Sequence, residues 1–398
     1  MPGLRGEAGA VVKRDGLVEI NSSAMSTPAR GAVYAPLTPG NTSGGGTIRV
    51  YVGRFNVSGP DVGWFHSSDN FANISIVTTN PSPPEYFYKF NTLGEQGNVA
   101  VTVDNKMYYA GNITTPGTDV LTIRVWDGIL DREFARIPKN VSISATAEPY
   151  TIYTLLAVGA TIYFSVLNNS LTGNDASSTI YSLDTKTGVI TKVGGDISTA
   201  ATDAQVISLG WSLGRLWAGT SELDPKVYYI RPSVDTAWTL DETFTAADVD
   251  QVKFLIDYRG TLFAGTRSNG GAETATIQAR APLDGAWTSS VSAPLGIANF
   301  TNATIFKGNL YVALHHQTGD DLYVKKYDGT TWSDAYTALN ATTGAEQPFV
   351  FSTAERVYFF RGVDNNDVVV SSDGTTWGSP IVLTGGNTQS WAVAAILV

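Results

Sequence analysis

Polar loops that could bind a cation or a sugar recur along the chain. His315 and His316 open one such loop, and Asp320 and Asp321 follow closely. Adjacent histidines on a strand point to opposite faces, so this pair is poorly arranged to bind one metal ion. Carboxylate and amide oxygens suit calcium or sugar hydroxyls, although the same residue types also make ordinary turns. The candidate binding residues of these loops, expected on one rim of the fold, are Asn174, Asp175, His315, His316, Asp320, Asp321, Asp364 and Asp367.

A second pattern combines an aspartate, a glycine and a tryptophan. Its clearest copy is Asp373-Gly374-Thr375-Thr376-Trp377, and two degenerate copies precede it. Asp-Gly favours a tight turn in which the carboxylate accepts backbone N–H bonds and the glycine takes a positive φ. The tryptophan is then available to pack between sheets, so the pattern predicts a structural role. The residues assigned to it are Asp284, Gly285, Trp287, Asp328, Gly329, Trp332, Asp373, Gly374 and Trp377.

This pattern resembles the Asp-box of sialidases and related β-propellers, a hairpin between the third and fourth strands of a blade. The resemblance implies a propeller fold and places the hairpins away from a catalytic face. A sialidase would also need an arginine triad, a tyrosine with a partnering glutamate and an acidic proton donor. The nearest segment, Phe134-Ala135-Arg136-Ile137-Pro138, carries an insertion and falls on a predicted fourth strand. We therefore expect no catalytic residues, no metal and no cofactor, and predict that the chain is not an enzyme.

The elements that would position these loops repeat along the chain. A short strand with a central aromatic residue recurs about every 50 residues, and a turn-rich segment follows each copy. The repeat predicts an all-β fold, a seven-bladed β-propeller of four-stranded antiparallel blades. The central aromatic residues are Tyr51, Tyr108, Tyr163, Trp217, Phe263, Tyr311 and Tyr358.

The two ends of the chain complement each other. Residues 390–398 supply a first strand with nothing after it, whereas the strands between residues 48 and 77 lack a first strand. Pairing the C-terminal strand with these N-terminal strands would close the propeller and hide both sheet edges. The predicted domains are an extended N-terminal arm over residues 1–46 and the propeller over residues 47–398.

Composition limits the range of partners. The formal net charge is -10, with 36 acidic and 26 basic residues, so tight nucleic-acid binding is not expected. The absence of cysteine excludes disulfides, thiolate nucleophiles and cysteine-ligated zinc. The sequence has no apolar stretch of about 18 residues, so membrane insertion is not expected either. The first twenty residues lack the apolar core of a signal peptide.

The N-terminal arm carries a narrower resemblance. Two of its segments, Lys13-Arg14-Asp15-Gly16-Leu17-Val18-Glu19-Ile20-Asn21 and Ala29-Arg30-Gly31-Ala32-Val33-Tyr34, resemble the opening of short-tail nozzle proteins of bacteriophages, with Asp15 where proline is common. The resemblance implies a virion structural protein of the tail, neck or surface, assembled in the host cytoplasm from copies of itself and other virion proteins. Arg14, Leu17, Arg30 and Tyr34 are assigned to assembly. Two alternatives stay open, a propeller that binds a host-surface carbohydrate and a sialidase-like glycoside hydrolase.

Overall fold

The chain folds almost entirely into antiparallel β-strands in the computed structural model. The structure describes residues 48–55, 63–67, 75–76, 99–113, 120–127, 131–137, 151–168, 177–198, 205–245, 249–268, 274–280, 285–294, 296–339, 348–361, 367–382 and 389–397. Within these ranges the secondary structure consists of strands and a short 3₁₀ turn, η4 (Gln317–Gly319). The predicted all-β class is confirmed. The predicted arm, with Arg14, Leu17, Arg30 and Tyr34, lies outside the described residues.

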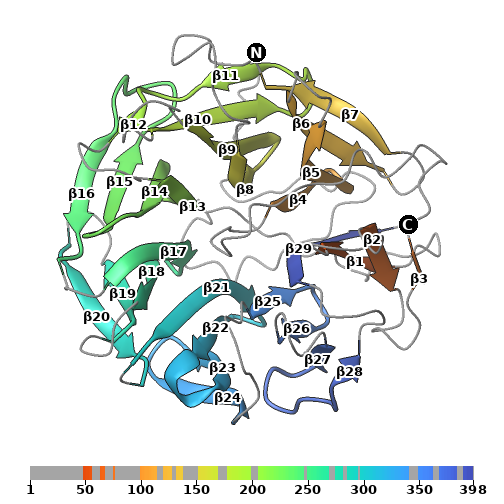
Figure 1. The fold of residues 1–398 in the computed structure, drawn as a ribbon, viewed down its shortest axis with the longest axis vertical. Helices are drawn as coiled ribbons and strands as arrows, with labels where there is room; N and C mark the ends of the chain where they lie inside the picture. The colour runs from red at the N-terminus through yellow and green to blue at the C-terminus, as the bar shows by residue number, and fades with distance from the viewer. Residues whose placement is uncertain are drawn as a thin grey trace, which may run out of the picture.

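Successive strands pair through hairpins into four-stranded units. The strands are β1 (Ile48–Phe55), β2 (Gly63–Ser67), β3 (Ser75–Ile76), β4 (Ala100–Val103), β5 (Lys106–Ile113), β6 (Val120–Trp126), β7 (Asp131–Arg136), β8 (Thr151–Val158), β9 (Thr161–Asn168), β10 (Ser177–Asp184), β11 (Ile190–Lys192), β12 (Ile197–Ser198), β13 (Gln205–Ser212), β14 (Arg215–Ser221), β15 (Lys226–Ile230), β16 (Thr239–Thr243), β17 (Val249–Tyr258), β18 (Thr261–Ser268), β19 (Thr276–Arg280), β20 (Trp287–Ser292), β21 (Ala298–Phe306), β22 (Asn309–His316), β23 (Asp321–Tyr327), β24 (Trp332–Ala338), β25 (Phe349–Ser352), β26 (Val357–Phe360), β27 (Asp367–Ser371), β28 (Ile381–Val382) and β29 (Gln389–Leu397). In the β8–β12 unit, β12 is a short extra strand paired with β10. Figure 1 shows the units around a common centre, with β8, β13, β17 and β21 innermost and β11, β16, β20 and β24 at the periphery.

Backbone pairing also joins neighbouring units. β14 pairs with β17 through Ser221 and Gln251, and β18 pairs with β21 through Arg267 and Asn299, so three consecutive units form one twelve-stranded sheet. At the chain ends, β29 pairs antiparallel with β1 in a sheet of order β29-β1-β2-β3. The predicted pairing of the C-terminal strand with an N-terminal strand is therefore present.

The repeated aromatic residues form the centre of the packing. The six whose side chains are described, Tyr108, Tyr163, Trp217, Phe263, Tyr311 and Tyr358, all lie on the second strand of a unit and are buried. An aromatic ring buries a large apolar area, and the rings contribute to the contacts between neighbouring units. The turns before these strands are tight, as at Asp104 and Asn105, whose φ values are +47° and +58°. Two consecutive positive φ values match the twist of the flanking strands.

Candidate functional site

Two of the hairpins between third and fourth strands share the same internal hydrogen bonds. Asp328 Oδ1 accepts the backbone N–H groups of Thr330 (2.7 Å) and Thr331 (2.8 Å). Asp373 Oδ1 accepts those of Thr375 and Thr376, both at 2.7 Å. Hydrogen bonds to Thr330 and Thr331 hold the pKa of Asp328 well below its usual range, and the N–H groups of residues 376 and 375 do the same for the pKa of Asp373.

The glycines of these hairpins occupy the left-handed region. Gly329 has φ +107° and Gly374 has φ +76°, as the Asp-Gly pattern predicts. Gly374 also lies against the preceding unit, because its carbonyl accepts a hydrogen bond from the Tyr311 hydroxyl (3.3 Å). In the third predicted copy Gly285 and Trp287 are described, whereas Asp284 lies outside the described residues.

The tryptophans of these hairpins contact the fourth strand of the preceding unit. Trp287 Nε1 donates to Asp241 Oδ2 (2.7 Å), and Trp332 Nε1 donates to Ser290 Oγ (2.8 Å). Both acceptors are the extra residue of a β-bulge, since the pairing register skips Asp241 in β16 and Ser290 in β20. A bulge redirects one side chain out of the ladder, and here it points that side chain at the next unit. Trp238, which sequence reasoning missed, makes a similar contact to the carbonyl oxygen of Val193 (3.2 Å).

Trp377 lacks the contact that the other tryptophans make. The bulge residue of the preceding fourth strand, β24, is Ala335, which has no side-chain acceptor. Trp377 and Ala335 pack against the same apolar cluster, and the Trp377 ring lies 5.6 Å from that of Tyr336. The Trp377 Nε1 atom is buried and has no hydrogen-bond partner among the described residues. The repeat therefore contains one incomplete interblade contact in the part of the chain that the structure describes.

The predicted histidine loop differs from the expectation. We expected His315 and His316 to open a solvated loop, but both residues end strand β22 and are buried, 3% and 9% exposed. The expectation was wrong because the strand extends two residues further than the apolar pattern indicated. Asp320 and Asp321 do close the turn: Asp320 takes φ +52° after η4, and Asp321 Oδ2 accepts a hydrogen bond from the Tyr323 hydroxyl (3.2 Å).

Asp367 is also misplaced by the sequence prediction. It begins strand β27, is 6% exposed and pairs with Arg361, whose Nε lies 2.5 Å from Asp367 Oδ1. Because its carboxylate is buried and paired across the neck of the loop, it is not a rim ligand. The hydrogen bond from Arg361 to Asp367 and the negative charge of Asp367 raise the pKa of Arg361. The other predicted rim residues, Asn174, Asp175 and Asp364, lie outside the described residues.

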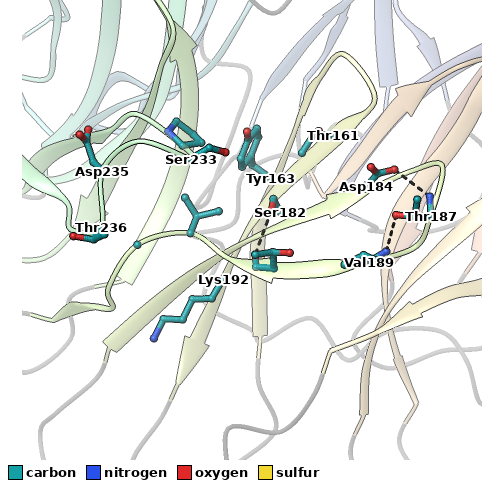
Figure 2. Close-up of a pocket in the computed structure, with 14 residues that line it drawn as sticks. Thr161, Tyr163, Ser182, Asp184, Thr187, Val189, Lys192, Ser233, Asp235 and Thr236 are labelled. Carbon is teal, nitrogen blue, oxygen red and sulfur yellow. Dashed lines mark hydrogen bonds between the residues drawn. The ribbon is translucent and has the colours of Figure 1, made fainter.

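A groove of about 740 Å³ opens between the β8–β12 and β13–β16 units. One wall is a face of the first unit, where cross-strand pairing aligns side chains in two rows. Tyr163, Ser182 and Thr191 are direct partners across β9, β10 and β11, and Thr161 pairs with Asp184 in the next row. Directly paired residues share one face of a sheet, so these hydroxyl groups point to the same side. Figure 2 shows Thr161, Tyr163, Ser182 and Asp184 of these rows along the groove.

The opposite wall of the groove is the turn between β15 and β16. It contributes Pro232, Ser233, Asp235 and Thr236. Asp235 is held by Arg231 through an ion pair of 2.7 Å and accepts the Arg231 N–H at 2.8 Å, and these contacts lower the pKa of Asp235. The turn is therefore fixed in place facing the hydroxyl rows.

The interface at the groove differs from another interface at one repeated position. At the interface between the β17–β20 and β21–β24 units, the ring of Tyr327 packs 5.6 Å from Phe263. Tyr327 is the last residue of its third strand, and the residue at that position in the β13–β16 unit is Ile230. Tyr163, the counterpart of Phe263, stacks instead on Trp211 (5.8 Å, 20°). Ile230 is fully buried in the apolar cluster that also contains Tyr163.

Sequence reasoning missed this groove, although it left a signal. In Ile180-Tyr181-Ser182-Leu183-Asp184 the residues 182 and 184 alternate with apolar ones, a period-two pattern with a hydroxyl and a carboxylate on one face. The pattern is short, and it does not reveal that a turn 50 residues away faces it.

Comparison with known proteins identifies the fold. No protein-family model and no curated protein sequence matches the chain. The periplasmic gluconolactonase of Pseudomonas aeruginosa aligns with a TM-score of 0.58 at 12% identity, over 88% of this chain and 99% of that one. A protein from Lactobacillus plantarum aligns with a TM-score of 0.55 at 10% identity, over 89% and 99% of the two chains. A prolyl endopeptidase aligns with a TM-score of 0.47 at 13% identity, over 74% and 44%. The chain has a β-propeller-like fold.

These similarities correct the prediction that the chain is not an enzyme. The propeller-like fold is also that of a gluconolactonase, so the lack of a sialidase constellation is no argument against catalysis. The sialidase-like segment itself is not arranged as a site, because Arg136 lies on the outer strand β7, mostly exposed and paired with Glu133 at 2.5 Å. At 12% identity the likeness establishes the fold and leaves the reaction open.

Two further properties concern the described residues alone. They include no helix long and apolar enough to cross a membrane. They also include no group of three or more histidine, aspartate or glutamate side chains placed to hold a metal ion.

Proposed function

We propose that the chain forms a closed seven-bladed β-propeller with Asp-box-type hairpins. The pairing of β29 with β1 supports closure, because it supplies a first strand to the sheet that would otherwise lack one. The recurrence of four-stranded units supports the blade count. The Asp328 and Asp373 turns and their interblade tryptophans support the hairpin type. A closed propeller has no open edge between its first and last blades.

The function we propose is assembly, as a structural subunit of a bacteriophage tail, neck or surface that contacts copies of itself and other virion proteins. The observation that carries this proposal is the outer edge of the fold. Leu240 on β16, Leu339 after β24 and Val382 on β28 are 50%, 63% and 65% exposed. Fourth strands are edge strands, and an exposed strand edge that carries aliphatic side chains favours pairing with another chain. The resemblance of the N-terminal arm to phage nozzle proteins adds the location in a virion.

The assembly proposal is tested on the purified full chain. Mass photometry and negative-stain imaging should show rings or higher oligomers with a defined copy number. Exchange of Leu240, Leu339 and Val382 for serine should shift the population to monomer while the circular dichroism spectrum stays unchanged. A matched triple exchange of exposed threonines, Thr239, Thr288 and Thr337, for serine should leave the assembly intact. A wild-type chain that stays monomeric at every concentration would contradict the proposal.

A second candidate function is attachment to a host-surface carbohydrate. The hydroxyl-lined groove between the β8–β12 and β13–β16 units favours it, because a row of hydroxyl groups can both donate and accept hydrogen bonds to a sugar. The two functions are compatible, since a virion subunit can carry a receptor-binding groove. Glycan binding by the purified chain tests the candidate, and silence across neutral and sialylated glycans would remove it.

A further inference from the structure

The groove is suited to a ligand that carries hydroxyl groups and no net charge. Its lining includes the hydroxyls of Thr161, Tyr163, Ser182, Thr187, Thr191 and Thr236. The hydroxyl of Tyr163 can donate and accept hydrogen bonds, and burial raises its pKa. Ser182 Oγ donates to the Thr191 carbonyl oxygen at 3.3 Å, a long hydrogen bond that leaves the Oγ lone pairs available to a ligand donor.

Charge in the groove argues against an anionic ligand. Lys192 is paired with Asp196 at 2.8 Å, and Asp235 is paired with Arg231. The remaining lining carboxylate, Asp184, uses Oδ1 to accept the N–H groups of Lys186 (2.7 Å) and Thr187 (3.1 Å), and these bonds lower its pKa. An ionised carboxylate beside neutral hydroxyls attracts hydroxyl donors and repels anions.

The shape of the groove agrees with this chemistry. A volume of about 740 Å³ lies within the range of small-ligand sites, roughly 300–1,000 Å³. Val189 lines the groove, is 57% exposed and provides apolar surface for the C–H face of a sugar ring. Figure 2 shows Thr161, Tyr163 and Ser182 near one another, with Val189 and Lys192 along the same side and Ser233, Asp235 and Thr236 on the other.

We propose that the groove between the β8–β12 and β13–β16 units binds a short, uncharged oligosaccharide, with Tyr163, Ser182 and Asp184 as hydrogen-bonding partners and Val189 as an apolar contact. The proposal rests on the carbohydrate-binding function above and gives it a location. That location differs from the predicted rim: it lies beside the turn that follows Asp184, between the end of β10 and the start of β11, whereas the predicted rim residue Asp320 lies between the end of β22 and the start of β23.

The matched variants follow from the repeat. Thr191→Trp places a large ring in the groove from an exposed position on β11. Its control is Thr288→Trp, because Thr288 is exposed and occupies the same place in the row Phe263, Ala279 and Thr288 of another unit. Tyr163→Phe and Ser182→Ala remove single hydroxyl groups without filling space. Asp320→Ala tests the predicted rim.

The experiment measures binding of the full chain to an array that carries neutral oligosaccharides of glucose, galactose, mannose and N-acetylglucosamine beside sialylated ones. Wild type should bind neutral glycans and not the sialylated ones. Thr191→Trp should weaken binding by more than about tenfold, and Tyr163→Phe and Ser182→Ala by about three- to tenfold each. Thr288→Trp and Asp320→Ala should match wild type. The conservative variants decide the question if Thr191→Trp fails to fold.

The outcomes separate the site from the function. Wild-type binding that survives the three groove substitutions would overturn the site and leave carbohydrate attachment standing, and loss in Asp320→Ala would then move the site to the rim. A preference for sialylated glycans would overturn the charge argument. A wild-type chain that binds no glycan on the array would overturn the groove site and the attachment function together, without bearing on assembly.

Discussion

Trp377 offers a test of the interblade contact, because the bulge residue of the preceding fourth strand, Ala335, has no side-chain acceptor. Ala335→Ser places a hydroxyl at the position from which Ser290 accepts the hydrogen bond of Trp332. We expect the Trp377 Nε1–H to donate to the new hydroxyl. The backbone of the bulge stays the same, since serine and alanine differ by one oxygen atom.

The magnitude follows from the state of the indole in the wild-type chain. A buried N–H without an acceptor costs about 1–3 kcal/mol, and a neutral hydrogen bond contributes about 1 kcal/mol net. Burying the serine hydroxyl offsets part of this gain. The free energy of unfolding should therefore rise by about 1 kcal/mol in Ala335→Ser. Ser290→Ala, which removes the acceptor of Trp332, should lower it by a similar amount.

Urea unfolding followed by tryptophan fluorescence measures these changes, and a double-mutant cycle isolates the contact. Phenylalanine at position 377 has no N–H, so Ala335→Ser should lose its benefit in a Trp377→Phe background. Ala338→Ser, on the same strand and beside the same apolar cluster, is the control for adding a hydroxyl and should bring no gain. Equal effects of Ala335→Ser in both backgrounds would refute the reasoning, as would a loss of stability with Trp377 present.

Two further predictions concern the hairpins. Gly374→Ala should destabilise the fold by more than Gly214→Ala. Both glycines have φ near +75°, but a Cβ at position 374 would overlap the buried Tyr311 hydroxyl, whereas a Cβ at position 214 would meet nothing within 4 Å. Gly214→Ala should lower the free energy of unfolding by about 1 kcal/mol in thermal or urea unfolding, and equal losses in the two variants would contradict the steric argument. The pKa of Asp373 is lowered below its ordinary value of 3.8, so the stability contributed by the Asp373 carboxylate is complete above pH 3.8 and declines as the pH falls below it. Melting temperatures between pH 6 and pH 2 should therefore fall less steeply in Asp373→Asn than in wild type. Identical slopes would show that the Asp373 charge does not stabilise the turn.

Local patterns were predictable where the physical cause was itself local. The Asp-Gly turn at residues 328 and 329 needs only a short carboxylate side chain and a residue that tolerates positive φ, and both are visible in the sequence. The central aromatic residues were also identifiable, because a strand buried on both faces needs large apolar side chains at regular intervals. Tyr163 and Tyr311 therefore lie where the repeat predicted them, on second strands.

Burial of polar residues was not predictable in the same way. His315 and Asp367 were assigned to loops because their residue types are common in loops, yet each lies on a strand and is buried. Asp367 is compatible with burial because Arg361 pairs with it, and the pair forms only once the strand and the loop return to each other. A single sequence does not contain that pairing in any local form.

The sequence by itself determined the all-β class, the repeated four-stranded unit and the turns, since alternation, spacing and turn chemistry act over a few residues. Only the tertiary structure decided which repeated positions meet across a blade interface. Trp332 finds an acceptor in Ser290, whereas the bulge residue of the strand before Trp377 is Ala335, although the two tryptophans are alike in sequence. The groove has the same origin, because it forms where β9, β10 and β11 meet the turn between β15 and β16. Contacts between residues far apart in the chain depend on the packing of both partners, and no local pattern specifies them.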